Sequence, residues 1–294
     1  MSQTIVFLGG DNRQKYIMQH LSSLPFIYNN YSTIDLIYPK SDTLDTILNA
    51  VNKANVLIAP LPIAADGLNI KITTSHQNQA NISIPFKDIV NELPYKSIVF
   101  AGGFSENMTA QMSIKNIKYY DYLKCECVQT KNAVATAEGT IMKAIEESII
   151  NMQGSNCLVL GYGKCAKVLA KKLRALDANV TICARAQESL CEASSWGYKT
   201  VHLNGLIKSI SNYDFIFNTI PTVILNQEVI NNISIDTVII DIASVPGGID
   251  YEYASKKNIK AFHYLGIPGK ISPKTSGYIL GEFIINHLEV ICVN

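Results

Sequence analysis

The sequence predicts an α/β protein of two doubly wound domains, in which parallel sheets are covered by helices on both faces. Short β-branched apolar runs recur along the chain, each ends in glycine, proline or a polar turn, and helical periodicity follows. The length of 294 residues is about twice the common domain size. Both observations favour two α/β domains over one.

The first half of the chain contains four predicted strands, at residues 4–8, 34–38, 56–58 and 97–100. Residues 136–153 then form one long predicted helix, because apolar side chains follow the helical period. These side chains are Ile141, Ala144, Ile145, Ile149 and Met152.

The second half contains six predicted strands, at residues 156–160, 179–183, 199–202, 214–218, 237–241 and 261–264. Six strands alternating with helices match a full doubly wound sheet. The last helical pattern, 274–290, has no strand left to follow, so we expect it to pack back on the first domain. The expected domains are therefore 1–135, 136–273 and a returning C-terminal helix within 274–294.

Composition excludes several classes of protein. The 25 basic and 24 acidic side chains give a net charge of +1, which argues against a nucleic-acid binder. The N-terminus lacks the pattern of a signal peptide, and no apolar stretch is long enough for a membrane span. The seven scattered cysteines indicate free thiols in a reducing cytosol rather than disulfides or a metal site. We expect a cytoplasmic protein without a metal.

The strongest motif is a glycine-rich turn, G-x-G-x-x-A, at residues 161–166 between an apolar strand and a predicted helix. Such a turn brings backbone N–H groups and a helix N-terminus to a pyrophosphate. A plain tight turn is the alternative. The placement predicts a Rossmann dinucleotide-binding domain, with cofactor contacts from Gly161, Tyr162, Gly163, Lys164 and Cys165.

The end of the second strand of this domain selects the dinucleotide. NAD sites usually carry an acid there for the ribose hydroxyl, but residues 178–187 contain none. Ala184 and Arg185 occupy that position, and a guanidinium can bind a 2′-phosphate in a bidentate fork. The sequence therefore favours NADP (NADPH), the alternative being a surface arginine at a turn. Arg174, beside two lysines in mid-helix, is expected on a solvated face.

Three further loops follow strands of the second domain, where ligands bind in open α/β sheets. Their small residues allow a flat nicotinamide ring to approach the backbone, although each loop alone is ordinary turn chemistry. The expected cofactor contacts in these loops are Asn218, Thr219, Ile220, Pro221, Asp241, Ala243, Ser244 and Gly266.

In the first domain, a loop with Gly10, Asp11 and Arg13 leads into the first helix. If the domains are arranged as in other two-domain dehydrogenases, a substrate carboxylate would be bound there by Arg13 and the helix N-terminus. The alternative is that Asp11 or its neighbour caps the helix and Arg13 lies in solvent. Of the five histidines, none has a catalytic role assigned by spacing alone.

Five motifs together resemble the family of the dipicolinate synthase A subunit, across the whole chain. They are GGDNRQ at 9–14, TAEGT at 136–140, LGYGKCA at 160–166, DIASVPGGID at 241–250 and LGIPGKISPKTSG at 265–277. The second half is also similar, less specifically, to alanine and hydroxyacid dehydrogenases.

The resemblance implies oxidation of dihydrodipicolinate to pyridine-2,6-dicarboxylate with hydride transfer to NADP, in a branch of the diaminopimelate/lysine pathway. It also implies a location in the mother cell of a sporulating bacterium, together with a second, flavoprotein-like subunit. Asp11, His76 or water are the candidates for accepting the proton. The substrate contacts implied are Gly10, Asp11, Arg13, Gly102, Gly103, Thr136 and Lys270.

Two other functions stay open at this point. The chain is either a non-catalytic NADP-binding partner of the second subunit, or a dehydrogenase of an amino or hydroxy acid. A homo-oligomer is a further hypothesis.

Overall fold

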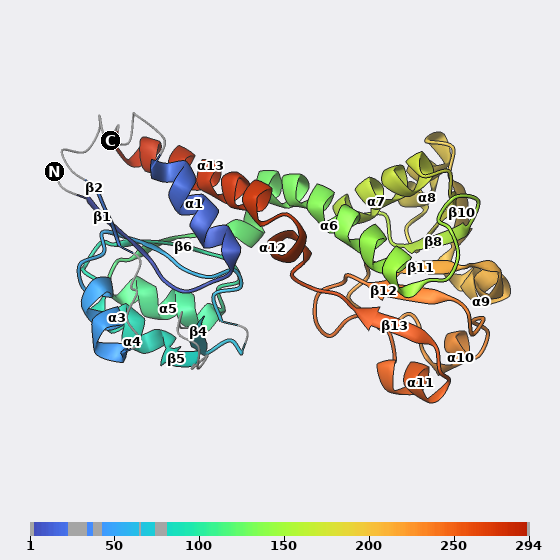
Figure 1. Cartoon of the computed structure of the whole chain (residues 1–294), viewed down its shortest axis with the longest axis horizontal. Coiled ribbons are helices and arrows are strands. Elements are labelled where there is room, and N and C mark those ends of the chain that lie inside the picture. The colour runs from blue at the N-terminus through green and yellow to red at the C-terminus, as the bar shows by residue number, and fades with distance from the viewer. Residues whose placement is uncertain (1–2, 23–33, 38–42, 65, 74–80, 293–294) are drawn as a thin grey trace. The chain divides into compact units, whose positions relative to one another are not determined.

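The computed structural model describes residues 3–22, 34–37, 43–64, 66–73 and 81–292, and the chain divides into two compact units (Figure 1). Unit 1 comprises Met1–Gln129 and Ser272–Asn294, and unit 2 comprises Thr130–Ile271. In the described ranges, no helix is both long and apolar enough to cross a membrane.

Unit 1 is built on a five-stranded parallel sheet in the order β2-β1-β3-β6-β7. The strands are β1 (Gln3–Phe7), β2 (Ile34–Ile37), β3 (Val56–Ile58), β6 (Ile98–Ala101) and β7 (Lys118–Asp121). A separate antiparallel hairpin is formed by β4 (Asn69–Thr73) and β5 (Asn81–Pro85). The helices of this unit are α1 (Asn12–Ser22), α3 (Leu44–Val51), α4 (Phe86–Glu92), α5 (Glu106–Ile114) and α13 (Pro273–Cys292).

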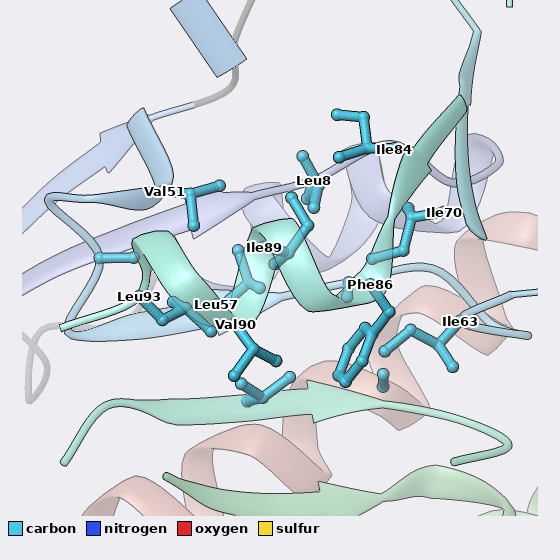
Figure 2. Close-up of a cluster of buried hydrophobic side chains, with 14 of the residues drawn as sticks. Leu8, Val51, Leu57, Ile63, Ile70, Ile84, Phe86, Ile89, Val90 and Leu93 are labelled. Atoms are coloured by element: carbon cyan, nitrogen blue, oxygen red, sulfur yellow. The ribbon is translucent and has the colours of Figure 1, made fainter. Parts of the chain in front are cut away.

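Successive apolar residues of a strand point to opposite faces, so this sheet buries both of its faces. Side chains from α3, α4, α5 and the hairpin cover one face, and Figure 2 shows Ile89 of α4 with Leu57 of β3 and Ile84 of β5. The other face, which includes Phe7 of β1, packs against α1 and α13. The unit is therefore covered on both sides of its sheet.

The contact between α1 and α13 depends on a close backbone approach. A Cβ atom on Gly277 of α13 would lie 2.8 Å from the carbonyl oxygen of Arg13. Glycine at this position lets the C-terminal helix lie directly on the helix that begins at the first loop.

Unit 2 is built on a six-stranded parallel sheet in the order β10-β9-β8-β11-β12-β13, the order of a dinucleotide-binding sheet. The strands are β8 (Asn156–Leu160), β9 (Asn179–Ala184), β10 (Lys199–His202), β11 (Phe215–Asn218), β12 (Val238–Asp241) and β13 (Lys260–His263). One face is covered by α6 (Glu126–Glu147), α7 (Lys164–Ala175) and α8 (Gln187–Ser195). The other carries α9 (Leu206–Ser209), α10 (Gln227–Ile230) and α11 (Tyr251–Lys256), while α12 (Ile267–Ile271) packs on α6 near Gly139.

The predicted fold class is confirmed, and the predicted strands are present to within about one residue at each described end. The bounds predicted for the long helix, 136–153, were wrong, because α6 spans Glu126–Glu147. The chain leaves the helix at Ser148, whose hydroxyl donates to the carbonyl oxygen of Ile150. Ile149, which the periodic pattern placed within the helix, lies beyond its end and is 88% exposed.

Candidate functional site

The candidate cofactor residues of unit 2 all follow the carboxyl ends of neighbouring parallel strands. The strand register pairs Leu160 with Cys183 and with Asn218, and pairs Asn218 with Asp241. The loops after β8, β9, β11 and β12 therefore leave the sheet at the same edge, where open α/β folds bind ligands.

The glycine turn after β8 has the geometry that the sequence predicts for phosphate binding. Gly161 has φ +96°, and a Cβ there would lie 2.4 Å from the Thr219 hydroxyl oxygen. A Cβ on Gly163 would meet no atom within 4 Å. Gly163 caps α7 without a side-chain hydrogen bond, and the N-terminus of a helix favours an anion. Ala166 is fully buried and allows the close helix–strand packing.

The side chains of Tyr162, Lys164 and Cys165 in this turn have different surroundings. The ring of Tyr162 is buried, lies 6.4 Å from the Tyr198 ring and has the Lys167 Nζ 5.3 Å from its centroid. Its side chain thus faces α7 and α8, which leaves its backbone for a cofactor. Lys164 is exposed at the start of α7. Burial raises the pKa of the Cys165 thiol, which keeps that side chain neutral.

Arg185 lies directly after β9 and is exposed, whereas Ala184 is buried. The Arg185 carbonyl oxygen accepts a hydrogen bond of 3.1 Å from His202 Nε2, because His202 Nδ1 accepts from Asn204 N–H. The helix α8 begins two residues later without a side-chain cap. Within the described part of the chain, the Arg185 guanidinium makes no ion pair. A free guanidinium beside an uncapped helix N-terminus suits a phosphate group.

The loops after β11 and β12 are tied together by the carboxylate of Asp241, which is fully buried. One oxygen accepts from Asn218 Nδ2 at 2.8 Å and from the Ala243 N–H at 2.9 Å. The other accepts from the Gly248 N–H and the Tyr251 hydroxyl, both at 2.7 Å. Burial and then the Asp241 carboxylate raise the pKa of Tyr251. The side chains of Asn218 and Asp241 thus shape these loops rather than face a ligand.

The other predicted contacts of these loops are uncharged and differ in exposure. The Thr219 hydroxyl donates to the Leu160 carbonyl oxygen at 2.8 Å, which anchors the loop to the end of β8. Ile220 is half-buried, Ala243 is buried, and Pro221 and Ser244 are exposed. Val223 and Val245 are also exposed, so the surface of these loops carries small and apolar side chains.

Two residues that support this edge, Tyr251 and His263, were not predicted from the sequence. The His263 Nε2 lies 2.8 Å from the Ala243 carbonyl oxygen, and its ring stacks on Tyr251 with centroids 5.6 Å apart. The signal that could have found His263 is the parallel register, since it pairs with Asp241. No local pattern points to Tyr251.

Three predicted contacts lie elsewhere in unit 2. Gly266 has φ +69° in the loop after β13, and the exposed Lys270 has its Nζ 4.8 Å from the Tyr264 ring centroid. Thr136 lies in α6, where its hydroxyl donates to the Asn132 carbonyl oxygen at 3.0 Å. Lys270 makes no ion pair with a residue that the structure describes, so its charge is available to an anion.

The first loop of unit 1 agrees with one of the two sequence alternatives in part, because Asp11 caps the helix. Arg13 is only 7% exposed, so the part of that alternative that placed it in solvent was wrong. Its Nε and Nη2 each lie 2.8 Å from a carboxylate oxygen of Asp11, and Nη2 also donates to the Leu61 carbonyl oxygen at 2.7 Å. Asp11 also accepts from the Arg13 N–H at 3.0 Å, as an N-terminal cap. The bidentate edge that we expected to hold a substrate carboxylate is therefore occupied by Asp11.

The other predicted substrate contacts of unit 1 follow the ends of β1 and β6. Gly10 has φ +94° directly after β1. A Cβ on Gly102 would lie 1.9 Å from Leu61 Cδ1, and the N–H of Gly103 donates to Asp121 Oδ1 at 3.1 Å. His76 lies outside the described residues. Over the described ranges, no group of three or more potential ligand side chains could hold a metal ion.

Comparison with known proteins gives matches along the whole chain. A family model described as the N-terminal domain of the dipicolinate synthase A subunit matches residues 4–123, and one for shikimate/quinate 5-dehydrogenase matches residues 143–264. The curated A subunit of dipicolinate synthase from Bacillus subtilis (strain 168) is 31% identical over 291 residues, with 95% of this chain and 94% of that protein covered.

Solved structures of the dipicolinate synthase A subunit also match this chain. A crystal structure of the dipicolinate synthase A subunit from Bacillus halodurans has a TM-score of 0.82 and 26% identity, covering 97% of each chain. The crystal structure of the same subunit from Bacillus subtilis has a TM-score of 0.81 and 28% identity, covering 99% of this chain and 97% of that one. A transhydrogenase from Sinorhizobium meliloti, at 14% identity and a TM-score of 0.66, covers 97% of this chain and 92% of that one and shares the fold.

Proposed function

The chain belongs to the family of the dipicolinate synthase A subunit, and on this premise we propose that it oxidises dihydrodipicolinate to dipicolinate with NADP during sporulation. Unit 2 has the fold of a nicotinamide-dinucleotide dehydrogenase domain. Bound NADP would supply the hydride acceptor. The pathway branch and the mother-cell location expected from the sequence belong to the same proposal.

The observation that carries the cofactor assignment is the unpaired Arg185 beside the uncapped N-terminus of α8. Glu188 is the first acid in the sequence after β9, and it lies inside the first turn of α8 rather than at the end of β9. Gly163 provides the open approach for a pyrophosphate at α7. These features support NADP over NAD, because the phosphate would replace the acid–hydroxyl contact of an NAD site.

The protein's share of the chemistry is to hold a dianion and to accept one proton. Aromatisation of the ring supplies driving force, so orientation of the substrate matters most. We assign one substrate carboxylate to Lys270, whose charge is unpaired within the described residues. If Arg13 binds the substrate, the substrate must either displace Asp11 from the guanidinium or bind to the remaining Nη1 of Arg13. Asp11, His76 and water stay the candidates for the proton acceptor.

Two alternatives differ from this proposal in measurable ways. The curated relative is named as one subunit of its synthase. That name supports the presence of a second subunit, expected to be flavoprotein-like, and it leaves room for a non-catalytic, NADP-binding role. The other alternative is a dehydrogenase of an amino or hydroxy acid. Reduction of NADP with alanine or a 2-hydroxy acid, and none with dihydrodipicolinate, would favour it. Light scattering tests for a homo-oligomer.

The cofactor assignment is tested by titrating NADPH and NADH into wild-type protein and the variant Arg185→Ala. We expect the variant to bind NADPH more weakly by about 1–3 kcal/mol, a factor of roughly 5 to 150, and NADH almost unchanged. Arg185→Lys should fall between, because it keeps the charge and loses the fork. Lys208→Ala, an exposed cation on α9, is the control. Equal affinity of the wild type for both cofactors would refute the role of Arg185.

A further inference from the structure

A groove of about 330 Å³ lies on the surface of unit 2, lined by residues of α7 and the C-terminal end of α8. The two helices are neighbours on one side of the sheet (Figure 1). Tyr162, Tyr198 and Trp196, the only tryptophan of the chain, contribute aromatic rings. A volume of this size is at the lower end of small-ligand sites.

The groove has a net positive charge. Lys167 forms an ion pair with Glu192, with Nζ 2.7 Å from Oε1, so these two charges compensate each other. Lys171 and Arg174, one helical turn apart on α7, remain. Among the residues described by the structure, neither has an acidic partner. The groove therefore favours an anion.

Arg174 is held in place by neutral groups. Its Cζ lies 4.6 Å from the centroid of the Tyr198 ring, and its Nη1 donates to the Trp196 carbonyl oxygen. Of the five N–H donors of a guanidinium, those on Nε and Nη2 make no hydrogen bond within the described part of the chain. A positioned guanidinium with free donors is suited to a carboxylate.

Two hydroxyl groups add neutral donors. Tyr162 is 9% exposed and Tyr198 is 8% exposed, and both line the groove. Neither hydroxyl has a hydrogen-bond partner among the described residues. Burial raises the pKa of both tyrosines, so both are protonated donors at neutral pH.

The indole of Trp196 supplies a flat apolar surface. The residue is 63% exposed, and no aromatic ring of the described chain stacks on it. An exposed indole beside cations is a platform for a planar ring, as in proteins that stack bases on aromatic side chains.

We propose that this groove is a binding site for a planar aromatic carboxylate, which shares only Tyr162 with the glycine turn after β8. The ring lies on Trp196, and the carboxylate is bound by Lys171, Arg174 and the tyrosine hydroxyls. Binding is measured without turnover, so this site stands or falls independently of the reaction proposed above.

The fluorescence of Trp196 measures occupancy directly, because no other tryptophan contributes. The probes are pyridine-2,6-dicarboxylate and benzene-1,3-dicarboxylate, compared with cis-cyclohexane-1,3-dicarboxylate and inorganic phosphate. We expect saturable quenching by both aromatic acids, and binding of the cyclohexane acid about tenfold weaker for lack of stacking. Equal binding of the cyclohexane acid, or quenching that never saturates, would overturn the proposal.

Two variants test the assigned contacts. Lys171→Gln and Tyr198→Phe should each weaken binding of the aromatic acids about fivefold, while the Tyr198 ring still supports Arg174. Lys208→Gln removes an exposed charge from α9, on the other face of the sheet, and should change nothing. The titration is repeated with saturating NADP. Competition by NADP, or an equal loss of affinity in the Lys208→Gln control, would place the ligand elsewhere and refute the site.

Discussion

Removal of the Tyr251 hydroxyl is a direct test of the buried hydrogen-bond network around Asp241. Tyr251→Phe leaves the ring in place and deletes one of four hydrogen bonds, of 2.7–2.9 Å, to a fully buried carboxylate. A hydrogen bond to a charged group is worth about 1.5–3 kcal/mol. We expect unit 2 to lose about 2 kcal/mol of unfolding free energy, since three donors still hold Asp241.

Urea denaturation followed by Trp196 fluorescence and circular dichroism measures this loss. Tyr253→Phe, on the same helix α11, is the matched control, because its hydroxyl donates to Asn231 Oδ1 in an exposed hydrogen bond of 2.9 Å. The control should lose less than about 1 kcal/mol. Equal losses in the two variants would refute the importance of the buried carboxylate.

The pH dependence gives a second check on the same variant. Burial and Asp241 raise the pKa of Tyr251 in the native state, whereas an unfolded tyrosine titrates near pH 10. As the pH rises above about 10, the unfolded state loses the proton first, and the stabilisation is lost. The difference between wild type and Tyr251→Phe should be constant between about pH 7 and 9 and shrink above about 10.

Three further experiments have expected outcomes. Gly161→Ala should lower the free energy of unfolding in urea by about 2–4 kcal/mol, because Gly161 has φ +96° and a Cβ there would lie 2.4 Å from the Thr219 hydroxyl oxygen. Gly163→Ala, with open space around its Cβ, should lower it by less than about 0.5 kcal/mol and weaken NADPH binding, and equal destabilisation by the two variants would contradict this difference. Tyr122→Phe should raise the free energy of unfolding, measured by thermal denaturation, by about 1 kcal/mol, because the Tyr122 hydroxyl is buried without a partner in the described structure. A lower free energy of unfolding would show that the hydroxyl makes a hydrogen bond. Burial raises the pKa of Cys157 to about 12, so mass spectrometry should find exposed Cys191 alkylated well before Cys157 at mildly alkaline pH, and similar rates would argue against the buried thiol.

The fold was predictable because local patterns agree with it. Most strands of the two parallel sheets are short apolar runs followed by a turn, and the glycine turn after β8 is typical of a dinucleotide-binding domain. The family resemblance based on five motifs is confirmed. The strand β7 and the β4–β5 hairpin were not predicted. The strand β7, with sequence KYYD at the edge of its sheet, buries too little for an apolar run to mark it.

The side-chain partners at the candidate site were less predictable. Arg185 could be placed at the end of β9 from the sequence, since a position relative to a strand is local information. The pairing of Arg13 with Asp11 depends on the tight turn after β1 and on Leu61, which is far away in the sequence. Asp241 draws donors from three different segments. Such contacts arise from tertiary structure, and no spacing in the sequence encodes them.

The central claim is that this chain transfers hydride from a dihydropyridine dicarboxylate to NADP. The most direct test supplies dihydrodipicolinate and NADP to the chain, first by itself and then with its second subunit, while NADPH and the aromatic product are followed by their absorbance. We expect equimolar NADPH and pyridine-2,6-dicarboxylate in both cases. Aromatic product formed without NADPH would contradict the claim.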